Sequence, residues 1–261
     1  MDESRPDNTV PSAWTRRHFV NTSAAGLAAL PLSPTLTAAF GQGLPDLSQR
    51  IVINALGGIS NANRPGGGDE DPAVPSSGTR SLDARALRDA LDSGMTATNV
   101  TLGYVAGPMD PYEFTIREIA TWNRRVRDNA ELRKVWSAAD IKRAKTNGQV
   151  GIIFGFQNSA MVEEDPSRVE TFGNLGVRVI QLTYNVRNQV GDGSMVAENR
   201  GLTETGRAVV EQLNANRILV DLSHSGEQTC LDAVQATAAP IVRSHDSETA
   251  SFRQSVSADP P

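Results

Sequence analysis

The sequence lacks the features that would place it in several large classes of protein. It contains one cysteine, Cys230, in 261 residues, so an internal disulfide is excluded. Aromatic residues make up 5% of the chain, and the net charge of −5 comes without any basic block. A site for nucleic acid or for anionic lipid is therefore not expected. Cys230 follows the start of a predicted helix, where a small buried thiol is expected rather than a nucleophile.

The first 39 residues have the composition of an export signal. Arg16 and Arg17 precede an apolar, alanine-rich stretch over residues 24–32, and small residues follow at 37–39. The apolar stretch is too short for a membrane span, which needs ~20 residues. Twin arginines before such a stretch predict a bacterial Tat signal peptide over residues 1–39. The Tat export machinery would then deliver residues 40–261 to the periplasm. The alternative is a disordered tail in which the arginine pair occurs by chance.

Short apolar segments alternate with amphipathic segments from residue 50 onwards. The expected strands cover residues 50–54, 96–102, 150–154, 177–182, 217–222 and 240–243. Segments with helical periodicity separate them, and parallel strands need such crossover connections. The pattern predicts an α/β fold with about six β/α units. Because polar residues collect at the strand ends, an incomplete (β/α)8 TIM barrel is expected, with an open doubly wound sheet as the alternative.

The longest predicted helix runs from Pro111 to about Trp136. Its candidate buried face consists of apolar residues at helical spacing, namely Phe114, Ile116, Ile119, Trp122, Val126 and Leu132. Its charged residues are expected to form a solvated face; these are Arg124, Arg125, Arg127, Asp128, Glu131, Arg133 and Lys134. Ser81 and Ser137 are expected to cap the preceding and the following helix.

Two Ser-His pairs follow the last two predicted strands. Ser223-His224 and Ser244-His245 occupy equivalent positions, and the chain has only three histidines in all. Histidine is an ordinary zinc ligand, and strand ends hold side chains rigidly. The alternative is a pair of hydrogen-bonded histidines at a barrel rim without a metal. Neighbouring residues of a strand point apart, so neither pair is expected to form a Ser-His dyad.

Three aspartates near these pairs have two possible roles each. Asp221 precedes His224 by three residues and would orient an imidazole or be a buried polar group of the strand. Asp246 would activate a water molecule or form a turn. Asp192 lies between two glycines and is most simply a turn residue, although its loop would face the site.

The strand-end motifs resemble those of the membrane (renal) dipeptidases, peptidase family M19, particularly the bacterial members. They occur in the family's order over residues 50–246: Gly155-Phe156-Gln157, Leu182-Thr183-Tyr184-Asn185, Gly191-Asp192-Gly193, Asp221-Leu222-Ser223-His224 and Ser244-His245. The resemblance implies a (β/α)8 barrel of the metallo-dependent hydrolase type that binds two zinc ions and hydrolyses dipeptides, in many cases with a D-residue on the carboxyl side. It also implies that His224 and His245 bind one zinc.

Several positions depart from the pattern that this resemblance implies. The family's His-x-Asp pair falls on Leu56 and Gly58, and its bridging carboxylate falls on Gln157. Leucine and glycine side chains cannot bind a cation, and a carboxamide offers one neutral oxygen. The substrate-contacting histidine falls on Tyr184, and the family's arginine has no clear match, since Arg253 stands at a different spacing. The aspartate expected after an eighth strand lies in sequence that this chain lacks, so a fragment or truncated product is expected.

These observations predict one zinc ion rather than two, held by His224 and His245 with Gln157 or water. Substrate contacts are expected from Tyr184, Asn185 and Asp192, and no catalytic residue is assigned. A dipeptidase-like hydrolase that uses metal-activated water on a small dipeptide-like substrate is expected. The alternatives are a non-catalytic or single-metal relative that binds a small peptide or amino-acid-like ligand, and a different amidohydrolase-like barrel. The chain is also compatible with a homodimer.

Overall fold

The computed structural model describes residues 49–61 and 82–245. The chain divides into two units, Met1–Asp46 and Leu47–Pro261, and every described residue belongs to the second. The predicted export signal, Ser81, Asp246 and Arg253 lie outside the described residues. Within these residues, no helix combines the length and the apolar character that crossing a bilayer requires.

The described residues form strands that alternate with helices, as the sequence predicts. The strands are β1 (Ile53–Gly57), β2 (Ala97–Thr101), β3 (Leu132–Lys134), β4 (Val150–Phe156), β5 (Val177–Gln181), β6 (Leu219–Asp221) and β7 (Ile241–Val242). The helices are α3 (Ala84–Asp92), α4 (Pro111–Asp128), α5 (Ala138–Thr146), the 3-10 helix η2 (Ala160–Val162), α6 (Arg168–Asn174), α7 (Glu204–Ala215) and α8 (Glu227–Ala236).

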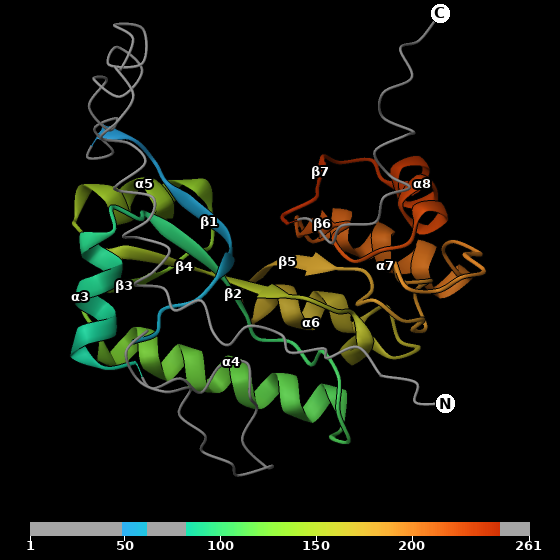
Figure 1. Ribbon diagram of the computed structural model, residues 1–261, viewed down its shortest axis with the longest axis horizontal. Coiled ribbons are helices and arrows are strands. Elements are labelled where there is room, and N and C mark those ends of the chain that lie inside the picture. The colour runs from blue at the N-terminus through green and yellow to red at the C-terminus, as the bar shows by residue number, and fades with distance from the viewer. Residues whose placement is uncertain (1–48, 62–81, 246–261) are drawn as a thin grey trace, which may run out of the picture. The chain divides into compact units, whose positions relative to one another are not determined.

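All strands pair in parallel, in the order β1-β2-β4-β5-β6-β7, and β3 pairs with β4 off this path. The sheet is curled and open, and helices α4 and α6 run along the same side of β2, β4 and β5 (Figure 1). The prediction of an α/β fold with an incomplete barrel is therefore confirmed. In such a sheet the carboxyl ends of successive strands meet at one edge, which brings the predicted strand-end motifs together.

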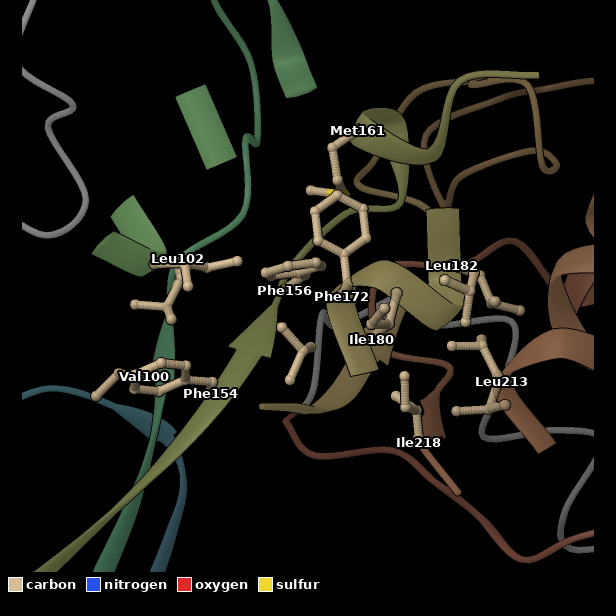
Figure 2. Close-up of a cluster of buried hydrophobic side chains, with 14 of the residues drawn as sticks. Val100, Leu102, Phe154, Phe156, Met161, Phe172, Ile180, Leu182, Leu213 and Ile218 are labelled. Atoms are coloured by element: carbon tan, nitrogen blue, oxygen red, sulfur yellow. The ribbon is translucent and has the colours of Figure 1, made fainter. Parts of the chain in front are cut away.

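Alternate residues of β4 pack against the helices. Phe154 and Phe156 belong to the main apolar cluster, and the ring of Phe156 meets that of Phe172 on α6 edge to face at 5.1 Å. Met161 of η2 lies over these rings, as Figure 2 shows. Burial of this cluster fixes the helices against the sheet and thereby sets the positions of the strand ends.

The opposite face of β4 carries two glycines, Gly151 and Gly155, on either side of Ile153. A Cβ atom added at Gly155 would lie 2.0 Å from Asn99 Oδ1, so the glycine makes room for a buried asparagine on β2. Asn99 Nδ2 donates a hydrogen bond to Ala55 O at 2.9 Å and so connects β2 with β1.

The predicted helix over residues 111–136 is wrong in its second part. Helix α4 ends at Asp128, and Leu132–Lys134 form the short strand β3 beside Val150–Ile152 of β4. Asn129 adopts an extended conformation, and its Nδ2 donates to Arg125 O at 2.7 Å, which satisfies a carbonyl of the last turn. The apolar residue Leu132 continues the helical spacing but is buried through the sheet instead.

Lys134 shows why the charged residues of this segment do not form one solvated face. Its Nζ donates to Asn123 Oδ1 and to Leu175 O, and it lies 4.2 Å from the centroid of the Phe154 ring. Burial, together with the nearby Arg178, lowers the pKa of Lys134 to about 8. The ammonium is therefore part of the packing between β3, α4 and α6, not a solvated group.

The prediction that Ser137 caps a helix is confirmed, whereas the prediction that Ser81 caps the preceding helix, α3, is wrong, because the cap residue there is Asp83. Ser137 and Asp140 form a capping box at the start of α5, and the hydroxyl of Thr203 accepts from Gly206 N at 2.9 Å at the start of α7. Cys230 is buried on α8, which confirms the expectation of a buried thiol, and burial raises the pKa of this thiol to about 11.

Candidate functional site

Three aromatic rings from three successive strand ends lie close together at the carboxyl edge of the sheet. The centroids of the His224 and His245 rings, which follow β6 and β7, are 4.8 Å apart with an interplanar angle of 57°. The ring of Tyr184, which follows β5, lies 4.4 Å from that of His224. The structure thus brings together two of the predicted metal ligands and one predicted substrate contact.

The carboxylate of Asp221, at the end of β6, holds the two histidine segments together. It is 2% exposed. Its Oδ1 accepts from the amide and the hydroxyl of Ser223 at 2.9 and 2.7 Å, and from Ser244 N at 3.2 Å. Its Oδ2 accepts from the hydroxyl of Ser244. Because these donors belong to the ends of both β6 and β7, one buried carboxylate fixes both.

The second Ser-His pair makes a contact that the spacing argument excluded. Ser244 Oγ lies 2.9 Å from His245 Nδ1, and His245 N donates to Ser223 Oγ at 3.2 Å. Strand β7 ends at Val242, so Ser244 and His245 do not alternate as residues of a strand do. The prediction that the two side chains point apart is therefore wrong. Ser244 donates its proton to Asp221, however, so this contact is not a nucleophilic dyad.

His224 is oriented from the loop that follows β5. Its Nδ1 lies 2.7 Å from Asn185 Oδ1. Both residues are in the left-handed region, with φ values of 57° and 60°, which asparagine tolerates better than most residues. Burial, followed by the proximity of His245, lowers the pKa of His224, so the neutral imidazole is favoured.

The loop over residues 183–203 is tied to the turn after β6. Ser194 N donates to His224 O at 2.8 Å, and Gly193 pairs with Ser225. Asp192 is 0% exposed. Its carboxylate accepts from Arg187 Nη1 at 2.6 Å and from Arg200 N at 2.7 Å. Asp192 thus stabilises the loop that carries Tyr184 and Asn185, and its contact with substrate stays a prediction.

Gln157 lies beyond the end of β4, where it bonds to neighbouring strands. Its Oε1 accepts from Thr101 Oγ1 at 3.1 Å, and its carbonyl oxygen accepts from Gln181 Nε2 at 2.6 Å. The hydrogen bonds of the described residues include none between Gln157 and either histidine. Its role as a metal ligand therefore stays a prediction, as do those of His224 and His245.

The donor set of the site can be tested against the zinc pair that the resemblance implies. Among the described residues, no group of three or more His, Cys, Asp or Glu side chains is placed to hold a metal ion. Two neighbouring imidazoles are ordinary ligands of a divalent cation, whereas Leu56, Gly58 and Gln157 supply no charged side chain at the positions where the resemblance places a histidine and two carboxylates. One zinc ion rather than two stays a prediction.

Sequence reasoning named Asp221 as an orienting candidate but missed Ser244 and the role of Asn185 toward His224. The serine that precedes each histidine was visible in the sequence. The contact between Ser244 and His245 was not, because it depends on the conformation of the chain beyond the end of β7.

The architecture and the site define a class of protein: an α/β barrel whose polar site lies at the carboxyl ends of parallel strands. The family model of the membrane dipeptidases, peptidase family M19, matches residues 82–257. The chain therefore belongs to the membrane dipeptidase family.

Curated relatives agree with this assignment. An uncharacterised dipeptidase of Schizosaccharomyces pombe is 31% identical over 139 residues, which cover 51% of this chain and 33% of the relative. A dipeptidase of Claviceps purpurea is 30% identical over 112 residues, which cover 42% of this chain and 26% of the relative. The matched region thus spans a third or less of either relative.

Solved structures show the same fold. An amidohydrolase from Pseudomonas aeruginosa superposes with a TM-score of 0.62 at 32% identity, over 76% of this chain and 54% of its own. A metallopeptidase from Rhodobacter sphaeroides, liganded with a phosphinate mimic of the dipeptide L-Ala-D-Ala, gives a TM-score of 0.60 at 19% identity, over 75% of this chain and 65% of its own.

Proposed function

We propose that this protein is a dipeptidase-like hydrolase whose site binds a single zinc ion at His224 and His245. The observation that carries the proposal is the proximity of these two imidazoles, whose centroids are 4.8 Å apart on the strand-end edge of the sheet. Membership of the dipeptidase family and the fold shared with a metallopeptidase that binds a dipeptide mimic support the same reaction class.

The residues of the site divide into two groups under this proposal. His224 and His245 would hold the ion, which when bound polarises a carbonyl group and lowers the pKa of a bound water molecule. The ring of Tyr184 lies 4.4 Å from that of His224, and its hydroxyl would donate a hydrogen bond to the substrate. Asp192 keeps the Tyr184 loop in place through Arg187 and Arg200. The peptide substrate is then held beside the imidazole pair rather than in bulk water.

A second candidate is a peptide-binding relative without hydrolytic activity. The observation that favours it is that Leu56, Gly58 and Gln157 stand where the family resemblance implies metal ligands. With fewer ligands the site would hold fewer cations, and therefore less of the positive charge that stabilises a developing oxyanion. Such a protein would bind a small peptide or an amino-acid-like ligand at the same strand ends.

Zinc content and dipeptide turnover of the purified protein test both candidates. We expect about one zinc per chain, loss of that zinc in His224→Ala and in His245→Ala, and hydrolysis of L-Ala-D-Ala that disappears with it. His18→Ala is the matched control, because it removes the third histidine of the chain. Zinc binding and L-Ala-D-Ala binding without turnover would favour the second candidate. Full zinc retention in both site variants would contradict the metal assignment.

We also propose that residues 1–39 direct export through the Tat machinery. The support is the pair Arg16-Arg17 before the apolar stretch. Replacing both arginines with lysine should retain the protein in the cytoplasm of a bacterial host, measured by cell fractionation with a Lys142→Arg control. Unchanged export of the arginine variant would contradict this proposal.

A further inference from the structure

We propose that Asp221, acting through Ser244, and Asn185 are positioning residues that give His245 and His224 the same tautomer, with the ring proton on Nδ1. The two imidazoles would then both carry their lone pair on Nε2 before any ligand arrives. The inference depends on the proposed function only for the use of those lone pairs in binding a cation.

The proton count around Asp221 determines the tautomer of His245. The hydroxyls of Ser223 and Ser244 each have one proton, and each donates to the carboxylate, which can only accept. Ser244 Oγ has therefore no proton left for His245 Nδ1, which lies 2.9 Å away. The short distance requires that Nδ1 is the donor, so the ring proton of His245 is on Nδ1.

The direction of these two hydroxyl protons also explains the contact between Ser223 and Ser244. Ser223 Oγ and Ser244 Oγ are 3.3 Å apart, and with both protons directed to Asp221 neither donates to the other. Ser223 Oγ instead accepts from His245 N at 3.2 Å. The two hydroxyls thus donate to the carboxylate and accept from His245, one from its main-chain amide and the other from its ring.

Asn185 has the corresponding role for His224. Its Oδ1, a carbonyl oxygen, accepts and cannot donate, so the 2.7 Å contact places a proton on His224 Nδ1. Ser194 Oγ donates to the same oxygen at 3.4 Å. The positive φ of Asn185 turns this side chain toward His224, and Met195 N, bonded to Asn185 O at 2.8 Å, supports that conformation.

The two rings would therefore have the same tautomer, although different elements orient them. The Asp221 carboxylate orients His245 through the hydroxyl of Ser244, and the carboxamide of Asn185, in the loop after β5, orients His224. A hydrogen bond of this kind to the far nitrogen of a ligating imidazole fixes its orientation and typically improves metal affinity about 10- to 100-fold. Under the proposed function, Asp221, Ser244 and Asn185 would therefore contribute to the affinity of the site for a cation by holding the two rings.

Long-range 1H–15N spectra of the full chain labelled with 15N-histidine test this directly. Three histidines give three sets of signals, and His224→Gln and His245→Gln assign two of them. The spectra are recorded without metal at alkaline pH, where imidazole is neutral. We expect the protonated nitrogen to be Nδ1 in both rings. A ring proton on Nε2 of either histidine would overturn the proposal for that residue.

Paired variants separate positioning from folding. Ser244→Ala should shift the tautomer of His245 only, and Asn185→Gly, which suits a φ of 60°, should shift that of His224 only. Ser244→Thr and Asn185→Asp retain the acceptor atom and should restore the wild-type spectrum. Ser167→Ala, which removes a hydroxyl bonded to Asp165, is the control. Unchanged tautomers in both Ser244→Ala and Asn185→Gly would contradict the positioning roles.

Titration with Co(II), followed by its absorption bands, supplies the second readout. We expect Ser244→Ala and Asn185→Gly each to weaken Co(II) binding about 10- to 100-fold, and Ser167→Ala to leave it unchanged. The two proposals can fail separately. The expected tautomers without L-Ala-D-Ala hydrolysis would reject the proposed activity alone, whereas hydrolysis by protein with a mixed tautomer would reject the positioning role alone.

Discussion

Asp221 and Ser244 are 23 positions apart, yet Ser244 gives both its amide and its hydroxyl proton to the Asp221 carboxylate. Strand β7 contains only Ile241 and Val242, and among the described strands it pairs with β6 alone. Longer series of main-chain hydrogen bonds hold the other strand ends in place. At the end of β7, the hydrogen bonds from Ser244 to the Asp221 carboxylate have this role. The position of His245 depends on this bond as much as on the strand before it.

Gly193 is required for the approach of the loop to the Asn185 main chain. A Cβ atom at this position would lie 2.3 Å from the carbonyl carbon of Asn185 and 2.7 Å from Val186 N, and main-chain atoms cannot rotate away. Gly193→Ala should therefore displace Asn185 and weaken its bond to His224, at a cost of about 1–3 kcal/mol in the free energy of unfolding. Urea denaturation and the 15N signals of His224 measure the two effects.

Gly58→Ala is the control for this variant, because no atom lies within 4 Å of the added Cβ position. The interpretation of the loop would be wrong if Gly193→Ala and Gly58→Ala left the His224 signals equally unchanged.

Glu118 should make the protein less stable as the pH rises. Its carboxyl is 2% exposed on α4, and burial raises its pKa from 4.5 to about 7, an effect that Arg125 partly offsets. Below pH 4.5 both the folded and the unfolded state hold the proton. Between about pH 4.5 and 7 the unfolded state releases it first, so the free energy of unfolding falls, by up to about 3 kcal/mol.

Glu118→Gln should remove this fall and stabilise the protein above pH 7, measured by urea denaturation across the pH range. His224 contributes the opposite slope, because its pKa is lowered and the unfolded state takes up the proton first as the pH falls below 6.5. The difference between wild type and variant isolates Glu118. Glu113→Gln, on the exposed side of the same helix, serves as the control. Equal pH dependence of wild type and Glu118→Gln would contradict the argument.

The six strands of the main path were predictable because short apolar or Thr/Val-rich segments alternate with helical crossovers, although β1 (Ile53–Gly57) begins three residues later than the strand predicted over residues 50–54. Strand β3 was not, since it has one apolar residue, Leu132, followed by Arg133 and Lys134. Its pairing depends on partners far along the chain, Val150–Ile152 and Leu175 O, which no local pattern contains. From the sequence alone, the charged residues of such a segment predict the exposed face of a helix, and only the tertiary contacts show that they belong to a strand.

The proximity of His224 and His245 was predictable for a similar reason, because parallel strands deliver their carboxyl ends to one edge. The bonds that orient the two rings were not. They depend on positive φ values at Asn185 and His224 and on the turn of the chain at Ser244, all of which lie beyond the regular strands. Periodicity predicts where a strand ends but not how the following three residues are arranged.

Asn99 and Gly155 should show coupled stabilities. Gly155→Ala places a methyl group 2.0 Å from Asn99 Oδ1, so the amide must move and its bond to Ala55 O weakens. We expect Gly155→Ala to cost about 1–3 kcal/mol in the free energy of unfolding. In an Asn99→Ala background the same substitution should cost much less, since the clash is gone. Urea denaturation of the two single variants and the double variant measures the coupling, and additive costs would contradict it.

Introducing the ligand types that the family resemblance implies should add a second zinc ion to the one that we propose. We expect the triple variant Leu56→His, Gly58→Asp, Gln157→Glu to bind about two zinc ions per chain, where the wild type binds about one. The structure accommodates two of these changes. The space around Gly58 is open, and Thr101 Oγ1, which donates to Gln157 Oε1 at 3.1 Å, would donate equally to a carboxylate.

Elemental analysis of the purified variant gives the number of ions, and Gln157→Glu alone is the control. One added carboxylate should strengthen the binding of a single ion without adding a second, because a second dication needs further charged ligands. Two ions in the wild type would show that the neutral residues at these positions do not limit the site. One ion in the triple variant would show that the carboxyl edge formed by β1 and β4 is not where the second ion binds.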